Sequence, residues 1–219
     1  MNPFPALLCF ITLAVSQASA VTANTPAKAP EPPCCREGLL PGKFSEKSLY
    51  SLEATWTADV GKEVKLAALH GRPQVIALFF TNCQHSCPLI VRDMKAIEKA
   101  LPINVRDRVD FLLVSIDPRR DTPEALQAFR EKYRLSNEHW SLLRGRAEDV
   151  KALADMVGFN YYAGSTPDVN QQYAHSLLIT VLNSTGEIVF QQVGIGNPTN
   201  EAVAAVLRLV ASKSKRGRL

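Results

Sequence analysis

Val75-Ile-Ala-Leu-Phe-Phe-Thr-Asn-Cys83-Gln-His-Ser-Cys87-Pro88 contains an apolar run, two cysteines and a proline in close succession. The apolar run from Val75 to Phe80 predicts a strand buried on both faces, and a helical pattern follows Pro88. Two thiols at positions i and i+4 can share one turn of a helix, so both sulfurs can face one ligand. Backbone N–H groups at the start of the helix favour a thiolate. The pair therefore predicts either redox chemistry or a metal site.

A third soft-ligand candidate is His175, just ahead of the strand-like run 177–182. Two cysteines and one histidine are the set that a copper site would use. Each residue also has a structural interpretation. A lone histidine ahead of a strand is more often a hydrogen-bonded structural residue. The cysteines could form a structural disulfide, although a bridge that closes so few residues would stabilise little.

The N-terminal segment predicts export. Residues 1–20 have no charged side chain and end in Ala18-Ser-Ala20, which indicates a secretory signal cleaved after Ala20. The expected location is the periplasm or the outer face of the cytoplasmic membrane. A short anchor or lipid attachment is the alternative, although the apolar stretch is too short for a spanning anchor, which needs about 20 apolar residues. Prolines then predict a linker over residues 21–42, with the compact part beginning near Leu40.

The formal net charge of +4 is matched by four basic residues in the tail, residues 212–219. The remainder of the chain is balanced, which argues against a face for nucleic acid. We expect the tail to stay solvated, and any membrane association to occur through a client or the termini. One domain is expected over residues 43–211.

The order of the elements predicts an α/β protein. Strand-like runs at 75–80 and 109–116 alternate with helical patterns at 90–101 and 126–133. Ahead of the second helical pattern, Asp121-Thr-Pro-Glu124 places a possible N-cap and an early proline. This alternation requires parallel strands, and a later hairpin adds an antiparallel edge. The plan is thioredoxin-like, with a mixed central sheet flanked by helices and an N-terminal β-hairpin extension. The other expected elements are a hairpin at 54–57 and 63–65, a short segment at 140–143, a helix at 150–157, a hairpin at 177–182 and 188–193, and a helix at 201–211.

Three blocks of sequence, Phe79–Pro88, Val114–Glu124 and Tyr173–Ser176, together resemble the Sco/SenC family over residues 43 to 211. These are thioredoxin-fold copper chaperones that help assemble the binuclear copper centre of cytochrome c oxidase. The resemblance implies Cys83, Cys87 and His175 as copper ligands. It also implies a partner, either the copper-bearing oxidase subunit or another copper chaperone. The ligand set suits Cu(I), and can hold Cu(II) with an added oxygen ligand.

Two positions depart from the family pattern. Family members commonly have Pro after the first cysteine and Asp before the histidine, whereas this chain has Gln84 and Ala174. A missing carboxylate next to His175 leaves the imidazole less firmly oriented, if that carboxylate supports the ligand. The competing function is a thiol:disulfide oxidoreductase that acts on client cysteines through Cys83 and Cys87.

Other residues near these motifs have less specific interpretations. The resemblance implies that Asp117, which follows the second central strand, is a neighbour of the metal loop, although a turn or helix-entry role fits equally. His85 should be solvated, and Met94 should pack in the core. Cys34 and Cys35 could bind metal, form a mixed disulfide with the Cys83/Cys87 pair, or be oxidised without a role. Adjacent residues of an extended chain point to opposite sides, which argues against chelation by both.

Overall fold

The computed structural model describes residues 30–36, 43–163 and 173–216 of the 219-residue chain. The predicted signal, most of the predicted linker and the last three residues of the basic tail lie outside these ranges. In the described part, no helix is both long and apolar enough to cross a membrane.

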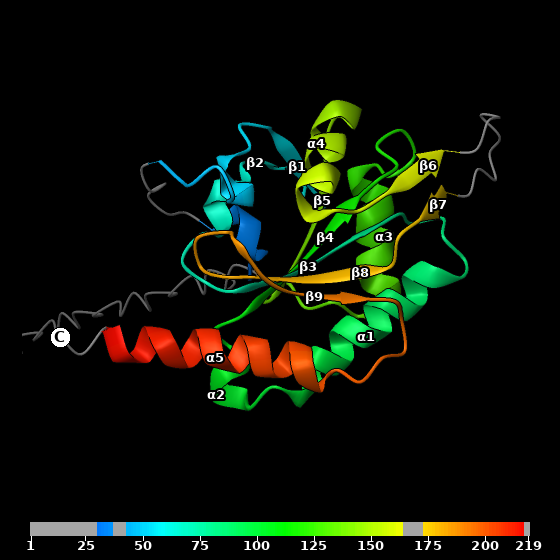
Figure 1. Cartoon of the computed structure of the whole chain (residues 1–219). Coiled ribbons are helices and arrows are strands. Elements are labelled where there is room, and N and C mark those ends of the chain that lie inside the picture. Colours follow the sequence, from blue (N-terminus) through cyan, green and yellow to red (C-terminus); the bar gives the residue numbers. More distant parts are fainter. Residues whose placement is uncertain (1–29, 37–42, 164–172, 217–219) are drawn as a thin grey trace, which may run out of the picture.

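A seven-stranded mixed sheet forms the centre of the molecule, in the order β2-β1-β5-β4-β3-β8-β9 (Figure 1). The three middle strands β5, β4 and β3 are parallel, and β8 and β9 continue the sheet antiparallel. The strands are β1 Trp56–Ala58, β2 Glu63–Val64, β3 Gln74–Phe79, β4 Asp110–Ser115, β5 Trp140–Arg144, β8 Leu178–Leu182 and β9 Ile188–Val193.

Helices cover both sides of this sheet, with α1 and α5 side by side on one side and α4 on the other (Figure 1). Together with the sheet, they make the predicted α/β, thioredoxin-like architecture. The helices are α1 Ser86–Ala100, α2 Ile103–Arg106, α3 Pro123–Tyr133, α4 Ala147–Val157 and α5 Asn200–Arg216, and the 3-10 turns are η1 Pro33–Cys35, η2 Leu49–Ser51 and η3 Leu66–Leu69.

The predicted N-terminal hairpin is confirmed as β1 and β2, with Trp56 opposite Val64. Strand β1 also pairs antiparallel with β5, where Thr57 lies opposite Arg144. The hairpin therefore extends the central sheet at one edge and is part of the same hydrogen-bonded layer.

The apolar runs of the sequence form the hydrophobic core of the protein. Every residue of β3, β4 and β8 is buried, because these strands have helices or loops on both faces. Phe111 of β4 stacks on Trp140 of β5 with ring centroids 4.8 Å apart. Met94 on α1 is buried in this core, as predicted. The strand that leads to the cysteines is thus held rigidly by its neighbours.

The start of α3 and the end of α4 have the kinds of residues that cap helices. The N-cap of α3 is Thr122, whose hydroxyl accepts the Ala125 N–H at 3.3 Å, with Pro123 following it. Asp121, one residue earlier, points into the protein and is buried. Gly158 ends α4 with a φ of 71°, in the left-handed conformation that glycine accepts most readily.

The linker prediction is wrong for Pro33–Cys35. These residues form η1, in which Cys34 and Cys35 are buried beside the core. The Cys34 N–H donates to Ser141 Oγ at 3.0 Å, so this segment is attached to β5. Small apolar thiols can fill such a position despite the surrounding prolines, so the compact structure begins before the expected boundary near Leu40.

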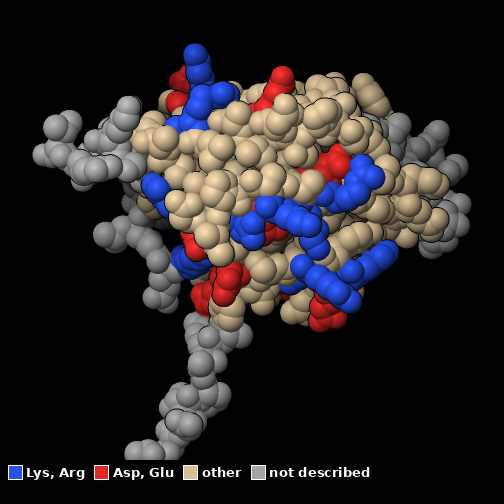
Figure 2. All heavy atoms as spheres, turned by 90° about the horizontal axis from the view of Figure 1, so that it is seen from below, with Lys and Arg blue, Asp and Glu red and all other residues tan. Residues whose placement is uncertain are grey.

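The surface seen in Figure 2 carries basic and acidic side chains intermixed among other residues. This pattern agrees with the near-balanced charge of the chain outside its tail.

Candidate metal centre

The two cysteines, Cys83 and Cys87, lie at the junction between β3 and α1, the cysteine junction. Helix α1 begins at Ser86, so Cys87 is in its first turn and Cys83 precedes the helix. The expectation that both thiols share one helical turn is therefore wrong. Pro88 explains the helix start, because a residue without an N–H is tolerated only in the first turn.

Cys83 Sγ sits at the N-terminus of α1. It accepts the backbone N–H of Cys87 at 3.3 Å and lies 3.4 Å from Ser86 Oγ. The Cys83 N–H in turn donates to Phe80 O at 3.3 Å, which closes the turn between strand and helix. Donors and the helix dipole both favour negative charge on this sulfur, as the sequence predicted.

The second sulfur has a different environment. The Cys87 side chain is buried, with an exposed fraction of 0%, whereas Cys83 is 6% exposed. A side-chain hydrogen bond with Cys83 raises the pKa of the Cys87 thiol, and burial raises it further. The pair thus combines one sulfur whose surroundings favour the thiolate with one whose raised pKa favours the protonated thiol.

His175 is the last residue of β7, Tyr173–His175, which pairs antiparallel with β6, Tyr161–Ala163, so that His175 lies opposite Tyr161. The prediction had no β6–β7 pair. The chain then enters β8, where Ile179 lies opposite Ala77 of β3. Since β8 runs antiparallel to β3, the segment before Ile179 passes the carboxyl end of β3, which leads to Cys83.

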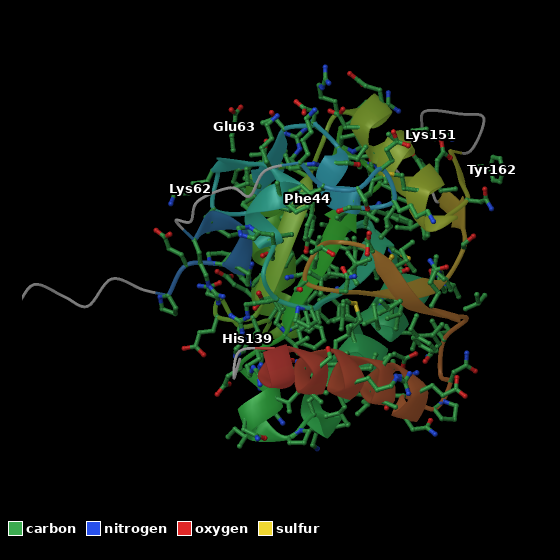
Figure 3. All side chains as sticks on the ribbon, turned by 60° about the vertical axis from the view of Figure 1, so that its left-hand side comes forward. Phe44, Lys62, Glu63, His139, Lys151 and Tyr162 are labelled. Carbon is green, nitrogen blue, oxygen red and sulfur yellow. The ribbon has the colours of Figure 1, made fainter. Side chains whose placement is uncertain are left out.

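The backbone therefore brings β7 to the same end of the sheet as the two cysteines, which Figure 1 shows. Tyr162 of β6 projects outward at this end and is 71% exposed (Figure 3). Among the described side chains, no three potential metal ligands of the His, Cys, Asp and Glu types converge. The His175 side chain is outside that description, so the three-ligand set remains a prediction.

Asp117 lies directly after β4 and is 2% exposed. Its carboxylate accepts a hydrogen bond from Arg120 Nε, and its N–H donates to Ser115 Oγ at 3.0 Å. These contacts make Asp117 the organiser of the turn between β4 and α3. The neighbouring Asp121 makes the contact between this turn and the segment before Cys83. The position of Asp117 itself beside the metal loop stays a prediction.

Asp121 is the residue that sequence reasoning missed. Its carboxylate is buried and accepts hydrogen bonds from the Thr81 N–H at 3.1 Å, from Thr81 Oγ1 and from Ser115 Oγ. It thereby joins the β4–α3 turn to the segment just before Cys83. Burial raises the pKa of Asp121, and the donors on Ser115 and Thr81 oppose that rise. The local Asp-Thr-Pro pattern indicated a helix cap and gave no signal of the contact with Thr81.

Other predicted residues are placed clearly. Gln84 and His85 are exposed between the cysteines, so His85 is solvated as expected. Ala174 lies opposite Tyr162 in the β6–β7 pair. Cys34 and Cys35 are in η1, which packs against β5 and η3 and is not part of this junction.

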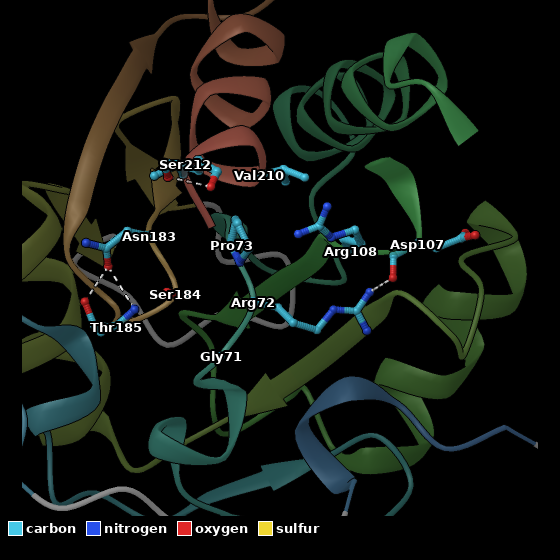
Figure 4. A pocket seen from close by; sticks show the side chains of 11 residues that line it. Gly71, Arg72, Pro73, Asp107, Arg108, Asn183, Ser184, Thr185, Val210 and Ser212 are labelled. Carbon is cyan, nitrogen blue, oxygen red and sulfur yellow. Dashed lines mark hydrogen bonds between the residues drawn. The ribbon is translucent and has the colours of Figure 1, made fainter. Parts of the chain in front are cut away.

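Among the cavities formed by the described residues, two lie at opposite ends of the sheet. One of about 420 Å³ is lined by Arg72, Arg108 and Asn183 near the amino ends of β3 and β4 (Figure 4). The other, of about 380 Å³, is lined by Pro118 and Arg144 on the side of the β4–α3 turn. The larger cavity is thus remote from the cysteine junction, and it has no part in the candidate metal centre.

Comparison with known proteins supports the family. The SCO2-like protein of Rickettsia typhi is 27% identical over 123 residues, which are 55% of this chain and 59% of that protein. A SCO1/SenC family lipoprotein from Bacillus anthracis is 28% identical, with a TM-score of 0.62, and the match covers 73% of this chain and 94% of that structure. ScoI of Bradyrhizobium japonicum, solved with copper bound, is 23% identical with a TM-score of 0.61, and 71% of this chain matches 96% of that one.

The chain spans less than two thirds of the length of the curated relatives that it first matches. The structural likenesses agree with the thioredoxin-like fold predicted from the order of elements. The model of the family described as SCO1/SenC matches residues 45–211, which include Cys83, Cys87 and His175. Because that match covers most of the sequence, the chain belongs to the SCO1/SenC family.

Proposed function

We propose that the protein is a copper-binding metallochaperone that delivers copper to cytochrome c oxidase, or prepares its copper site, through Cys83, Cys87 and His175. The observation that carries this proposal is the Cys83 sulfur at the N-terminus of α1, 3.3 Å from the Cys87 N–H. Copper bound to ScoI of Bradyrhizobium japonicum, a protein of the same fold, supports the choice of metal. Two thiolates and an imidazole are the donors that Cu(I) prefers.

The residues of the junction have distinct roles in this function. Cys83 offers the sulfur that the helix N-terminus already stabilises as a thiolate. Cys87 must lose its proton, so copper binding releases protons and strengthens as the pH rises. Asp121 holds Thr81, and with it the turn that carries Cys83, in place. His175 completes the set from the segment that precedes β8, and a client thiolate can replace one ligand at a time.

The second candidate function is a thiol:disulfide oxidoreductase acting on client cysteines. It is favoured by the side-chain hydrogen bond between Cys83 and Cys87, which places the two sulfurs close together. In this function Cys83 would attack a client disulfide and Cys87 would resolve the mixed disulfide. Metal binding would not be required, so the two functions differ in a simple measurement.

That measurement is an anaerobic Cu(I) titration of the reduced protein against a competing chelator. We expect one tightly bound Cu(I) per chain, loss of binding in Cys83→Ser, and weaker binding in His175→Ala. His85→Ala is the matched control, because His85 is exposed beside the cysteines and is expected to leave the affinity unchanged. Failure of the parent protein to compete for copper would leave the oxidoreductase as the better interpretation.

We also propose that the protein acts outside the cytoplasmic membrane, with residues 1–20 as an export signal and 21–42 as a linker apart from the buried turn Pro33–Cys35. Residues 212–219 are the proposed basic tail, into which α5 extends as far as Arg216. The naming of the Bacillus anthracis relative as a lipoprotein supports an exported or membrane-anchored location. The partner in that location would be the copper-bearing oxidase subunit or another copper chaperone.

A further inference from the structure

Cys34 and Cys35 are a second pair of thiols that the proposed function does not use. Their sulfur atoms are 3.3 Å apart, because η1 is a turn and not the extended chain that would place them on opposite sides. The exposed fractions are 1% for Cys34 and 6% for Cys35. The Cys34 N–H is fixed on Ser141 Oγ at 3.0 Å, so the fold holds the two sulfurs in contact.

The charges around the pair distinguish the two sulfurs. The hydrogen bond from Cys34 lowers the pKa of Cys35, and Lys62 lowers it further, against the opposing effects of burial, Asp59 and Glu31. Lys62 Nζ forms an ion pair with Glu31 at 3.3 Å and lies at the edge of the molecule (Figure 3). The same hydrogen bond and burial raise the pKa of Cys34. Cys35 is therefore the more readily ionised thiol, and it belongs to the more exposed residue of the two.

The pair is separate from the cysteine junction. Ser141 of β5 accepts the Cys34 N–H. It is at the same level of the sheet as Ile76 of β3, because both strands pair with β4 in a register that aligns these two residues. From Ile76 to the end of β3 is about 10 Å along the strand, and two strand spacings add about 10 Å across the sheet. A mixed disulfide between the two pairs, one of the roles that the sequence left open, would require η1 to leave its place in the core.

We propose that Cys34 and Cys35 form a second redox site, which cycles between two thiols and a disulfide between adjacent residues, with a low-molecular-weight disulfide as oxidant. The Cys35 thiolate attacks one sulfur of the oxidant, a mixed disulfide forms, and one thiolate leaves. Cys34 then loses its proton and attacks the Cys35 sulfur, and the second thiolate leaves. Two protein thiols are oxidised and one disulfide molecule is reduced to two thiols.

The expected disulfide is labile. Adjacent Cα atoms are about 3.8 Å apart across a trans peptide bond, below the range of about 4.4–6.8 Å usual for disulfides. Strain of this kind makes a disulfide easier to reduce. The adjacent pair therefore suits reversible oxidation and not a permanent structural bridge.

The test uses the full chain with Cys9→Ser, Cys83→Ser and Cys87→Ser, in which the pair supplies the only thiols. The reduced protein is equilibrated anaerobically in glutathione buffers of increasing oxidised fraction, quenched with acid, alkylated after denaturation and weighed by mass spectrometry. We expect one reversible transition from two alkylated thiols to none, with a loss of two hydrogen masses and only a minor glutathione adduct.

Two matched variants test the assigned roles. Adding Cys34→Ser removes the resolving thiol, so a glutathione adduct on Cys35 should accumulate, whereas adding Cys35→Ser should leave Cys34 unmodified. Circular dichroism checks that each variant is folded. Two alkylated thiols at every buffer ratio, or a dominant adduct in the parent, would overturn the proposal. All these proteins lack the copper cysteines, so the outcome does not depend on the proposed copper function.

Discussion

Asp121 joins the segment before Cys83 to the turn between β4 and α3 through hydrogen bonds from Thr81 and Ser115. In Asp121→Asn, the amide NH₂ would face one of the donors on Thr81 or Ser115, which leaves buried donors without acceptors. We expect a loss of about 1–3 kcal/mol in the free energy of unfolding at acid pH. The raised pKa of the carboxyl determines how this loss varies with pH.

Because the pKa of Asp121 is higher in the folded than in the unfolded protein, this carboxyl favours folding most below the unfolded pKa of about 3.9. Its contribution falls as the pH rises through the folded-state pKa. The difference in unfolding free energy between parent and variant should therefore shrink from about pH 4 towards neutrality. Urea unfolding across this range measures it, with the exposed Asp155→Asn as control. A difference that grows with pH would contradict the assignment.

The sequence predicts only part of this site. Cys83 and Cys87 follow from their position after an apolar run, and the helix N-terminus beside them follows from the helical pattern. The role of Asp121 does not, because its partner Thr81 is 40 residues earlier in the chain and the contact arises only when β3 and β4 pair. The sulfur contact of Cys34 and Cys35 was missed for a related reason, since Pro-rich composition conceals a buried turn.

At the scale of elements, long or strongly patterned segments were predicted correctly, whereas the short strands β6 and β7 were not. The apolar runs of β3, β4 and β8 and the helical periodicity of α1 and α4 are local signals. Strands β6 and β7 have three residues each and no distinctive alternation, so their pairing is a product of the fold. Pairings of this kind are beyond what local periodicity can indicate.

The attachment of α3 to the N-terminal hairpin is also a tertiary feature. Arg130 of α3 donates two hydrogen bonds to the carboxylate of Asp59, which lies beside β1. One comes from Nε and the other from Nη2, at 3.1 Å, and both side chains are buried. Arg130→Met leaves the carboxylate of Asp59 buried without its partner, and should lower the free energy of unfolding by about 3–5 kcal/mol.

Adding Asp59→Asn to Arg130→Met should recover part of that loss, because it removes the unpaired charge. Denaturant unfolding of the two single variants and the double variant gives the coupling energy directly. Arg119→Met, at an exposed position in the turn before α3, is the control and should change stability by less than about 0.5 kcal/mol. If the losses of unfolding free energy in the two single variants simply add in the double variant, the buried ion pair does not hold α3 to the hairpin.

At the scale of the whole molecule, the proposed copper ligands come from segments far apart in the sequence. Cys87 lies in the first turn of α1, and His175 ends β7, with two residues between it and the start of β8 at Leu178. Unfolding separates these segments, so copper that requires all three ligands binds the folded protein in preference to the unfolded one. At free Cu(I) of about 100 times the Kd, the expected stabilisation is about 2.7 kcal/mol.

Thermal unfolding of the reduced protein under buffered free Cu(I) measures this stabilisation as a rise in Tm that grows with the logarithm of free copper. His175→Ala should reduce the rise, since the remaining cysteines are four residues apart and can hold copper in the unfolded chain as well. His85→Ala should behave like the parent. An equal rise in the parent and in His175→Ala would mean that the two cysteines bind copper without His175, and that copper does not link α1 to the segment before β8.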